Sequence, residues 1–201
     1  MKKSRNSTTK FTIIIICMVA LVVGYYAYLS NRSMERRSEA DMSVVESVLS
    51  RDLVNDYPAT PKEVVKYYNE IMKCFYNEAC TDQEIDDLGQ KARELYDAEL
   101  LEANELGTYM MNLRAEIQNY KDKGRRLTSA SVAASTSVKF YEVDGYSFAR
   151  ILCGYNIMED RKNYAVKTVY LLRRDEDRRW KIYGWESADK VNLGEESGQE
   201  Q

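Results

Sequence analysis

The stretch KFYEVDGYSFARILCGY (residues 139–155) predicts two antiparallel β-strands joined by a tight turn. Its centre, Asp144-Gly145, is a dipeptide favoured in two-residue hairpin turns, because such turns need positive φ angles at both central positions. If this turn sets the register, Val143 faces Tyr146, and apolar residues of both strands fall on one face of the sheet. The stretch therefore indicates a hairpin with one buried face.

The hairpin belongs to a longer antiparallel sheet. Residues 127–158 keep a period of two on both sides of the turn, so they predict one long pair of strands. Residues 164–174 and 179–187 have the composition of two further strands, separated by the charged segment 175–178. The sequence thus predicts a sheet of about four strands.

Three helices are predicted before the sheet. Two begin with the same capping pattern, T-x-x-E, at residues 60–63 and 81–84, in which the threonine hydroxyl and the glutamate carboxylate bond to free backbone N–H groups. Apolar residues follow at helical spacing in residues 64–75 and 85–95, and a third set occupies residues 110–120. A helical half followed by a strand half is typical of the α+β class.

This order of elements, with a last strand that contains RWKI (residues 179–182), resembles the cone-shaped α+β fold of nuclear transport factor 2, ketosteroid isomerases and polyketide cyclases. The resemblance covers residues 57–188. It implies three helices packed on a curved antiparallel sheet, as in a cystatin/nuclear transport factor 2-like roll, with a pocket on the concave side. It also implies that the other side of the sheet can form a dimer.

A membrane anchor is predicted ahead of this domain. The run FTIIIICMVALVVGYYAYL (residues 11–29) contains no charged residue. As a helix it would span about 28 Å, close to the roughly 30 Å hydrocarbon core of a bilayer. A cleavable signal peptide would have a shorter apolar region, followed by small residues at both the −3 and the −1 position of the cleavage site. Around residues 27–30 these two positions cannot both be small. We therefore predict an uncleaved transmembrane helix over residues 11–30.

Basic residues around the anchor predict its orientation. Residues 1–10 carry four, whereas Arg32, Arg36 and Arg37 follow the apolar run. The positive-inside rule then favours a cytoplasmic N-terminus, with the domain outside the cell membrane. Residues 31–56 are predicted to form a juxtamembrane linker, and the polar residues 189–201 a disordered tail.

With the anchor included, the chain also resembles two groups of bacterial envelope proteins. One comprises uncharacterised single-span proteins of Gram-positive bacteria that carry such a domain, and the other the bitopic scaffold subunits of type IV secretion and conjugation machines. The resemblances imply an extracytoplasmic domain that binds a ligand or a protein. An envelope assembly scaffold and a pocket enzyme, such as an isomerase or dehydratase, are the alternatives. A buried, uncharged carboxylic acid in the cone would favour the enzyme.

Composition excludes several kinds of chemistry. After residue 31 the chain holds all 32 carboxylates but only 25 of the 29 basic residues, a net charge of −7. Such a domain repels phosphate backbones, so nucleic acid is not an expected partner. The chain has no histidine, which removes Ser-His and Cys-His catalysis and most zinc chemistry. We predict no catalytic residue, no metal site and no cofactor, and the ligand of a pocket stays open.

The last strand, RWKIYGWES (residues 179–187), carries both tryptophans of the chain. In regular strand geometry Lys181, Tyr183 and Trp185 share the face opposite Trp180. A bulge at Gly184 would instead return both tryptophans to one face. The regular geometry predicts that Lys181, Tyr183 and Trp185 form an outer surface that binds an envelope protein or a second copy of the domain.

Two residue pairs are further candidate sites. Cys74 and Cys80 flank the turn between the first two helices, outside the cytoplasm in the predicted topology, so they are either a disulfide or two free thiols. Lys139 lies opposite Arg150 if the Asp-Gly turn sets the register. Opposed like charges destabilise a strand pair. The pair is therefore either an anion-binding patch or is neutralised by a nearby carboxylate.

Overall fold

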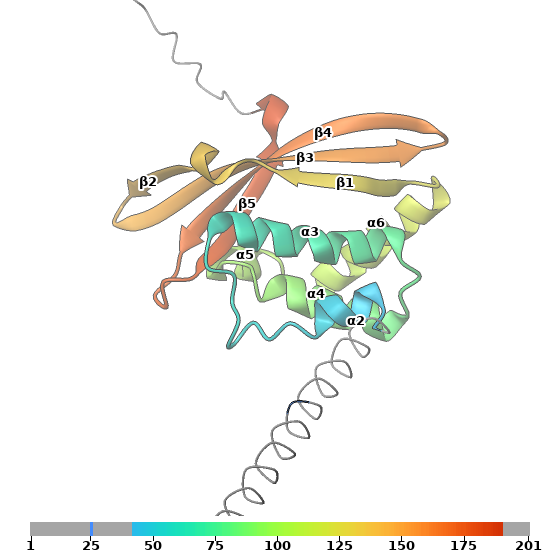
Figure 1. Cartoon of the computed structure of the whole chain (residues 1–201), viewed down its shortest axis with the longest axis horizontal. Coiled ribbons are helices and arrows are strands. Elements are labelled where there is room, and N and C mark those ends of the chain that lie inside the picture. The colour runs from blue at the N-terminus through green and yellow to red at the C-terminus, as the bar shows by residue number, and fades with distance from the viewer. Residues whose placement is uncertain (1–24, 26–41, 191–201) are drawn as a thin grey trace, which may run out of the picture. The chain divides into compact units, whose positions relative to one another are not determined.

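Five strands form one curved antiparallel sheet in the computed structural model, which describes Tyr25 and residues 42–190. In chain order they are β1 (Arg126–Val132), β2 (Lys139–Val143), β3 (Tyr146–Glu159), β4 (Lys162–Arg174) and β5 (Trp180–Ser187). β3 and β4 pair along nearly their whole length and form the centre of the sheet (Figure 1). β5 continues the sheet beyond β4, and β1 and β2 share the other edge of β3. The α+β class predicted from the sequence is confirmed.

The sheet has one strand more than the sequence predicts. Residues 127–143, expected as one strand, are divided by a 3-10 turn, η1 (Ser135–Ser137). The two pieces, β1 and β2, pair with the two halves of β3. The register predicted around Asp144-Gly145 is confirmed, since Val143 pairs with Tyr146 and both turn residues have positive φ angles.

The helices lie together on one face of the sheet (Figure 1). The described part of the chain has five α-helices, which are α2 (Val44–Leu49), α3 (Pro61–Asn77), α4 (Asp82–Arg93), α5 (Ala98–Ala103) and α6 (Leu106–Asp122). Three of them, α3, α4 and α6, correspond to predicted helices, and the capping boxes at Thr60 and Thr81 are both formed. The short helices α2 and α5 are additional to the prediction.

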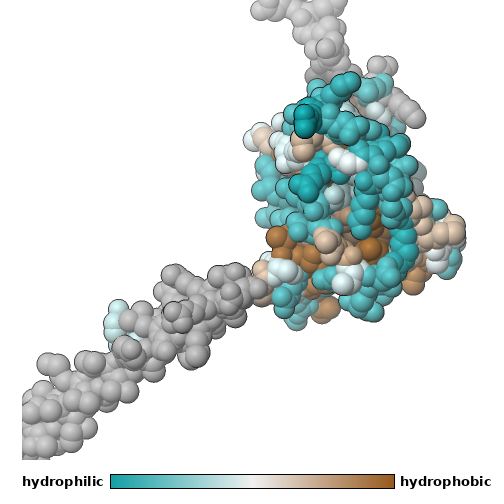
Figure 2. All heavy atoms as spheres, turned by 90° about the vertical axis from the view of Figure 1, so that its right-hand side faces the viewer, coloured by the Kyte–Doolittle hydropathy of each residue, from teal (hydrophilic) through white to brown (hydrophobic). Residues whose placement is uncertain are grey.

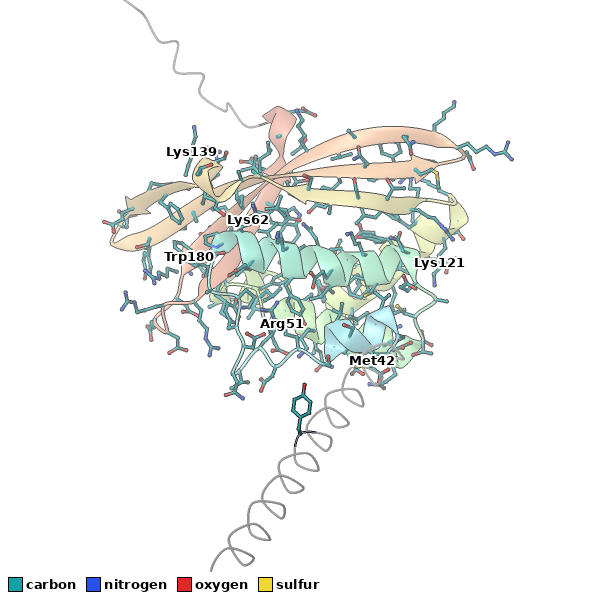
Figure 3. The ribbon with its side chains drawn as sticks, viewed as in Figure 1. Met42, Arg51, Lys62, Lys121, Lys139 and Trp180 are labelled. Carbon is teal, nitrogen blue, oxygen red and sulfur yellow. The ribbon has the colours of Figure 1, made fainter. Side chains whose placement is uncertain are left out.

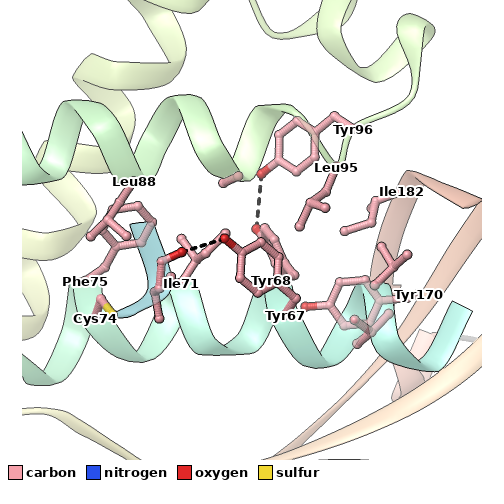
Figure 4. Packing of buried hydrophobic residues seen from close by; sticks show 14 of the residues in the cluster. Tyr67, Tyr68, Ile71, Cys74, Phe75, Leu88, Leu95, Tyr96, Tyr170 and Ile182 are labelled. Atoms are coloured by element: carbon pink, nitrogen blue, oxygen red, sulfur yellow. Dashed lines mark hydrogen bonds between the residues drawn. The ribbon is translucent and has the colours of Figure 1, made fainter. Parts of the chain in front are cut away.

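α3 is the central helix of the core. It contacts α2, α4, α6 and the strands β1, β3 and β5. Figure 4 shows Phe75 of α3 beside Leu88 of α4, and Ile182 of β5 near Leu95 and Tyr170 at the other end of the same core cluster. Full burial of a side chain of this size contributes about 1.5–3 kcal/mol to stability. The tyrosine-rich face of α3 is therefore held in a fixed position against the sheet.

α2 lies inside the segment that the sequence assigns to a linker. Val45 and Val48 are buried in the same core as α3. The hydroxyl of Tyr67 also donates a hydrogen bond to the carbonyl oxygen of Val48, at 2.7 Å. The compact unit accordingly begins at Val44.

The edge strand β5 contains a β-bulge that decides where Trp185 lies. Leu171 pairs with Gly184 and Leu172 pairs with Ile182, so Tyr183 has no partner on β4. The extra residue reverses the alternation of side chains beyond it. Trp185 consequently lies on the helix-covered face, the same face as Trp180. The prediction that Trp185 lies opposite Trp180 is wrong, and the bulge considered as the alternative is the observed geometry.

The predicted N-terminal tail and transmembrane helix (residues 1–30) lie outside the described residues, apart from Tyr25, and so does nearly all of the predicted C-terminal tail. Among the described helices, none combines the length and the apolar character that crossing a membrane requires. Seen from the end where β3 turns into β4, the surface of the domain is mainly hydrophilic, and hydrophobic residues gather in a smaller area on the helix side (Figure 2).

Candidate functional site

A cavity of about 350 Å³ lies between α3, α6 and the helix-covered face of the sheet. Small-molecule sites commonly have volumes of about 300–1,000 Å³. Aromatic side chains dominate its wall, which includes seven tyrosines and one tryptophan: Tyr68, Tyr76, Tyr96, Tyr109, Tyr120, Tyr155, Tyr170 and Trp185. The other lining residues are Met72, Leu113, Leu127, Ile157 and Val166, which are apolar, and Asn104, Asn112, Glu116 and Thr168, which are polar.

Regular secondary structure aims these side chains at one space. On α3 the lining residues Tyr68, Met72 and Tyr76 are four residues apart, so they fall on one face of the helix. On β4 the lining residues Val166, Thr168 and Tyr170 alternate with residues that point away from the helices. The same periodicities that bury a core therefore build the wall of the cavity.

Four aromatic rings meet at the β5 end of the cavity. The ring of Tyr68 lies 6.0 Å, between ring centroids, from each of Tyr96, Tyr170 and Trp185. The ring of Trp185 lies 5.9 Å from that of Tyr96 and 6.1 Å from that of Tyr170. Tyr68, Tyr96 and Tyr170 are buried, whereas Trp185 is 46% exposed. Trp185 therefore stands where the aromatic cluster meets solvent.

The hydroxyl groups of the wall form a chain of hydrogen bonds. The hydroxyl of Tyr155 donates to Oδ1 of Asn69 at 2.7 Å. Its oxygen lies 2.6 Å from the hydroxyl oxygen of Tyr170, which must then donate to Tyr155. Asn69 in turn donates from Nδ2 to Sγ of Cys153 at 3.3 Å. This series of hydrogen bonds fixes the orientation of the four side chains and leaves the lone pairs of the Tyr170 oxygen available as acceptors.

A second contact joins the hydroxyls of Tyr68 and Tyr96, whose oxygens lie 3.1 Å apart (Figure 4). Burial raises the pKa of both tyrosines well above the ordinary value, and it does the same for Tyr155 and Tyr170. At neutral pH these hydroxyls are therefore protonated. They can donate and accept hydrogen bonds, but they cannot act as bases.

Glu116 is the single charged residue of the wall. Its side chain is solvent-exposed, and its Oε1 accepts a hydrogen bond from the hydroxyl of Tyr76 at 2.7 Å. The buried carboxylic acid that would favour an enzyme is not among the residues that line the cavity. What the arrangement offers is aromatic surface, neutral hydroxyls and one exposed negative charge.

The buried carboxylate of the described residues lies elsewhere, at the edge of β5. Asp97 is 3% exposed, and its two oxygens accept hydrogen bonds from the guanidinium of Arg173. Arg173 also donates to Glu99 at 2.6 Å and lies over the rings of Tyr146 and Tyr183, 4.9 and 4.8 Å from their centroids. The hydrogen bond to Asp97 is the main cause that raises the pKa of Arg173, and the hydrogen bond to Glu99 raises it further. The group ties α5 to the sheet and is structural.

The structure does not bring the three predicted interface residues together. Lys181 donates from Nζ to the carbonyl oxygen of Glu94 at 2.7 Å. Tyr183 donates from its hydroxyl to Glu99 at 2.7 Å, and Trp185 lines the cavity. The shared outer face expected for them is therefore absent, because of the bulge in β5. An interface through Lys181 and Tyr183 stays a prediction.

The predicted opposition of Lys139 and Arg150 is found, since the two residues pair across β2 and β3. Lys139 points to the side of the sheet away from the helices, whereas Trp180 lies on the helix side (Figure 3). A carboxylate is close, because Nη2 of Arg150 lies 3.8 Å from Oε1 of Glu186. This contact is the one expected if the like charges are neutralised, and anion binding at the pair stays a prediction.

Cys74 and Cys80 are free thiols in the structure. Sγ of Cys80 lies 3.4 Å from the carbonyl oxygen of Cys74, as a hydrogen-bond donor. Cys74 is buried within α3, and burial raises its pKa to about 12. The structure contains no bond between the two sulfurs, and a disulfide in the isolated protein stays a prediction.

Tyr68, Tyr120 and Tyr155 occupy positions with the periodicity of a core. Tyr68 is in the core and the other two pack against it, and all three also line the cavity. Periodicity identifies the inward face of an element but does not show whether that face meets side chains or space. The available signal was compositional: the chain has 16 tyrosines and no histidine. Such a composition suits a polar aromatic wall better than an entirely apolar core.

Comparisons with known proteins identify a family. A search of curated proteins finds no match. Among solved structures, the crystal structure of CagV, a VirB8 homolog of T4SS from Helicobacter pylori strain 26695, is similar to this chain with a TM-score of 0.36 and 13% sequence identity, over 62% of this chain and 95% of that one. A similarity of this size assigns no function. Residues 1–185 match a domain of unknown function, DUF6715, so the chain belongs to the DUF6715 family.

Proposed function

We propose that the domain from Val44 to Lys190 binds a small organic molecule and catalyses no reaction. The observation that carries the proposal is the cavity of about 350 Å³ with a wall of seven tyrosines and one tryptophan. Aromatic surface with a few convergent polar groups is typical of ligand sites. Every buried side-chain nitrogen and oxygen of the described residues already has a hydrogen-bond partner, so the wall is preorganised.

The alternative of a pocket enzyme receives less support from this wall. Proton transfer near neutral pH needs an acid or base whose pKa is brought towards 7. The buried tyrosines have their pKa raised by burial, away from neutrality, and Glu116 is exposed on the cavity wall. Binding therefore accounts for the observed groups without a further catalytic residue.

A ligand screen on paired variants tests this function. Thr168 of β4 lines the cavity, whereas its neighbour Lys167 is exposed and lies on the opposite face of the strand. We expect small organic fragments to bind the full chain in ligand-observed NMR, and Thr168→Trp to abolish that binding by filling the cavity. Lys167→Trp adds the same ring outside the cavity and should leave binding unchanged. Equal binding to the Thr168→Trp variant, or no fragment binding at all, would contradict the proposal.

We place the binding domain outside the cell membrane, on a single-pass anchor with a cytoplasmic N-terminus. The uncharged run at residues 11–29 and the basic residues that precede it support this topology. Protease added to intact spheroplasts should digest the domain and leave the N-terminal tail protected. Survival of the whole domain would show the opposite orientation.

A second candidate function, an envelope scaffold, is favoured by exposed aromatic residues on the β2–β3 hairpin. Tyr141, Val143 and Tyr146 are exposed, and they share one face of the hairpin, because Val143 pairs with Tyr146 and Tyr141 is two residues from Val143. Clustered exposed apolar side chains often mark protein contacts. Light scattering of the full chain at increasing concentration tests this function, since Tyr141→Ser should reduce self-association or binding of an envelope partner. An unchanged association would remove the hairpin as the contact surface.

A further inference from the structure

We infer that the ligand of the cavity is an organic ammonium ion, which lies against the ring of Trp185 in the aromatic cluster of Tyr68, Tyr96, Tyr170 and Trp185 and is attracted by the negative charge of Glu116 on the same cavity wall. The inference rests on the proposed binding function and adds the chemical class of the ligand. It follows from the rings, the charges and the hydroxyl groups of the wall.

The rings form a site suited to a cation. The face of an aromatic ring carries negative potential and attracts an ammonium group, most strongly when the ring is that of tryptophan and also when it is that of tyrosine or phenylalanine. Trp185 is 46% exposed and offers its ring to a ligand, whereas Tyr68, Tyr96 and Tyr170 are at most 4% exposed. The three tyrosines pack against Trp185 with centroid separations of 5.9–6.1 Å and planes tilted by 38–48° from that of the tryptophan. They hold the tryptophan ring in place, so that it can lie against a rounded group such as a methylated nitrogen.

The charge of the wall has the matching sign. No lysine or arginine is among the residues that line the cavity, and Glu116 is the one ionisable carboxylate there. An anionic ligand would therefore meet a negative group in the wall. The guanidinium groups of Arg93 and Arg125 lie 5.3 and 5.8 Å from the ring centroids of Tyr109 and Tyr120, but neither arginine lines the cavity. A cation would gain from both the carboxylate and the rings, because a site partly shielded from water strengthens such interactions.

The hydroxyl groups offer acceptors for the rest of the ligand. The hydroxyl of Tyr170 donates a hydrogen bond to Tyr155, and the hydroxyl of Tyr155 donates one to Asn69. The Tyr170 oxygen can therefore only accept a further hydrogen bond, through its lone pairs. Neutral hydroxyls that accept hydrogen bonds suit the N–H groups or a hydroxyl arm of an amine. The ligand class that fits all three features is a small ammonium compound with a short polar arm.

A charge-only comparison of two probes tests the inference. Choline and its neutral isostere 3,3-dimethyl-1-butanol have the same shape but differ in the central atom of the head, nitrogen or carbon. We expect isothermal titration of the full chain in phosphatidylglycerol nanodiscs to give choline a Kd at least about tenfold lower, which corresponds to about 1.4 kcal/mol. Repeating the titration in phosphatidylcholine nanodiscs separates a free ligand from a lipid headgroup, because headgroups that fill the cavity would lower the apparent affinity for choline.

Variants assign the effect to named residues. Trp185→Leu should weaken choline binding about tenfold, whereas Trp185→Phe keeps an aromatic face and should lose less than about threefold. Glu116→Gln should also weaken choline binding and leave the affinity for the neutral isostere unchanged. Phe140→Leu removes an exposed aromatic ring outside the cavity and is the control. Circular dichroism shows whether each variant is folded, and the phenylalanine variant keeps the test valid if Trp185→Leu does not fold.

The outcomes separate the inference from the proposed function. Equal Kd values for choline and its isostere, or a Glu116→Gln variant that binds choline as tightly as the parent chain, would overturn the ammonium inference. Fragments that bind the parent chain but not Thr168→Trp would still support the cavity as a ligand site. If no fragment of any charge enters the cavity, the proposed function fails and the inference fails with it.

Discussion

Raising the pH above about 10 should unfold the domain, because its buried tyrosines ionise at a higher pH in the folded chain than in the unfolded chain. Tyr67, Tyr68, Tyr96 and Tyr170 are at most 4% exposed. Burial raises the pKa of each above the ordinary value of about 10, to about 12 for Tyr67. The unfolded chain loses these protons first. The stability that the four hydroxyls contribute is therefore fully present below the unfolded pKa and is lost as the pH rises towards the folded one.

The size of the effect follows from linkage. Each tyrosine that stays protonated in the folded state lowers the free energy of unfolding by about 1.4 kcal/mol for each pH unit above about 10. Four such residues lower it by about 5.6 kcal/mol per unit, compared with a total stability of about 5–15 kcal/mol for a small domain. Unfolding is thus expected within about one to three units above pH 10.

Two spectroscopic signals measured together test this reasoning. The ultraviolet absorbance of tyrosinate should rise in two phases, first from tyrosines on the surface and then, cooperatively, from the buried ones. The second phase should coincide with the loss of helical circular dichroism. If all tyrosines ionise in one phase while the helical signal is unchanged, the hydroxyls are accessible in the folded state and the wall described above is incorrect.

Three further predictions concern stability and thiol chemistry. Asp97→Ala leaves the guanidinium of Arg173 without its buried partner and should lower the free energy of unfolding by about 3 kcal/mol in urea denaturation. The exposed control Asp82→Ala should lower it by at most about 1 kcal/mol. Similar losses for both variants would show that the Asp97 contact is unimportant. Thr60→Ala removes an observed N-cap and should cost about 1 kcal/mol in the same assay. Iodoacetamide should modify Cys74 much more slowly in the folded than in the unfolded chain, because the raised pKa keeps the thiol protonated. A disulfide-linked peptide in a non-reduced digest would show instead that Cys74 and Cys80 form a disulfide.

Local chemistry made the strand register and the helix starts predictable. Asp144-Gly145 predicts the turn that pairs Val143 with Tyr146, and the T-x-x-E patterns predict helices at Thr60 and Thr81. The break between β1 and β2 could not be found in the same way. The run around Ser135–Ser137 contains no proline or glycine, and its small residues suit a strand as well as a turn.

The cavity was harder to predict than the fold. Gly184 indicates that a bulge is possible in β5, but the sequence does not decide between a bulge and a regular strand. That choice moves Trp185 from the outer face to the cavity wall. The tyrosines of α3 and β4 have the same spacing whether they fill a core or border a space. The distinction depends on the distance between α6 and the sheet, which is set by tertiary packing.

The most direct test of the cavity as a ligand site uses the two tryptophans of the chain. Labelling with 5-fluorotryptophan gives one ¹⁹F resonance for Trp185, which lines the cavity, and one for Trp180, which does not. The variant Trp185→Phe assigns the two signals. On titration of the full chain with the tightest fragment of the screen, the Trp185 resonance should shift and saturate while the Trp180 resonance stays in place. A shift of Trp180 alone, or no shift of Trp185 at saturation, would contradict the central claim that this cavity is the binding site.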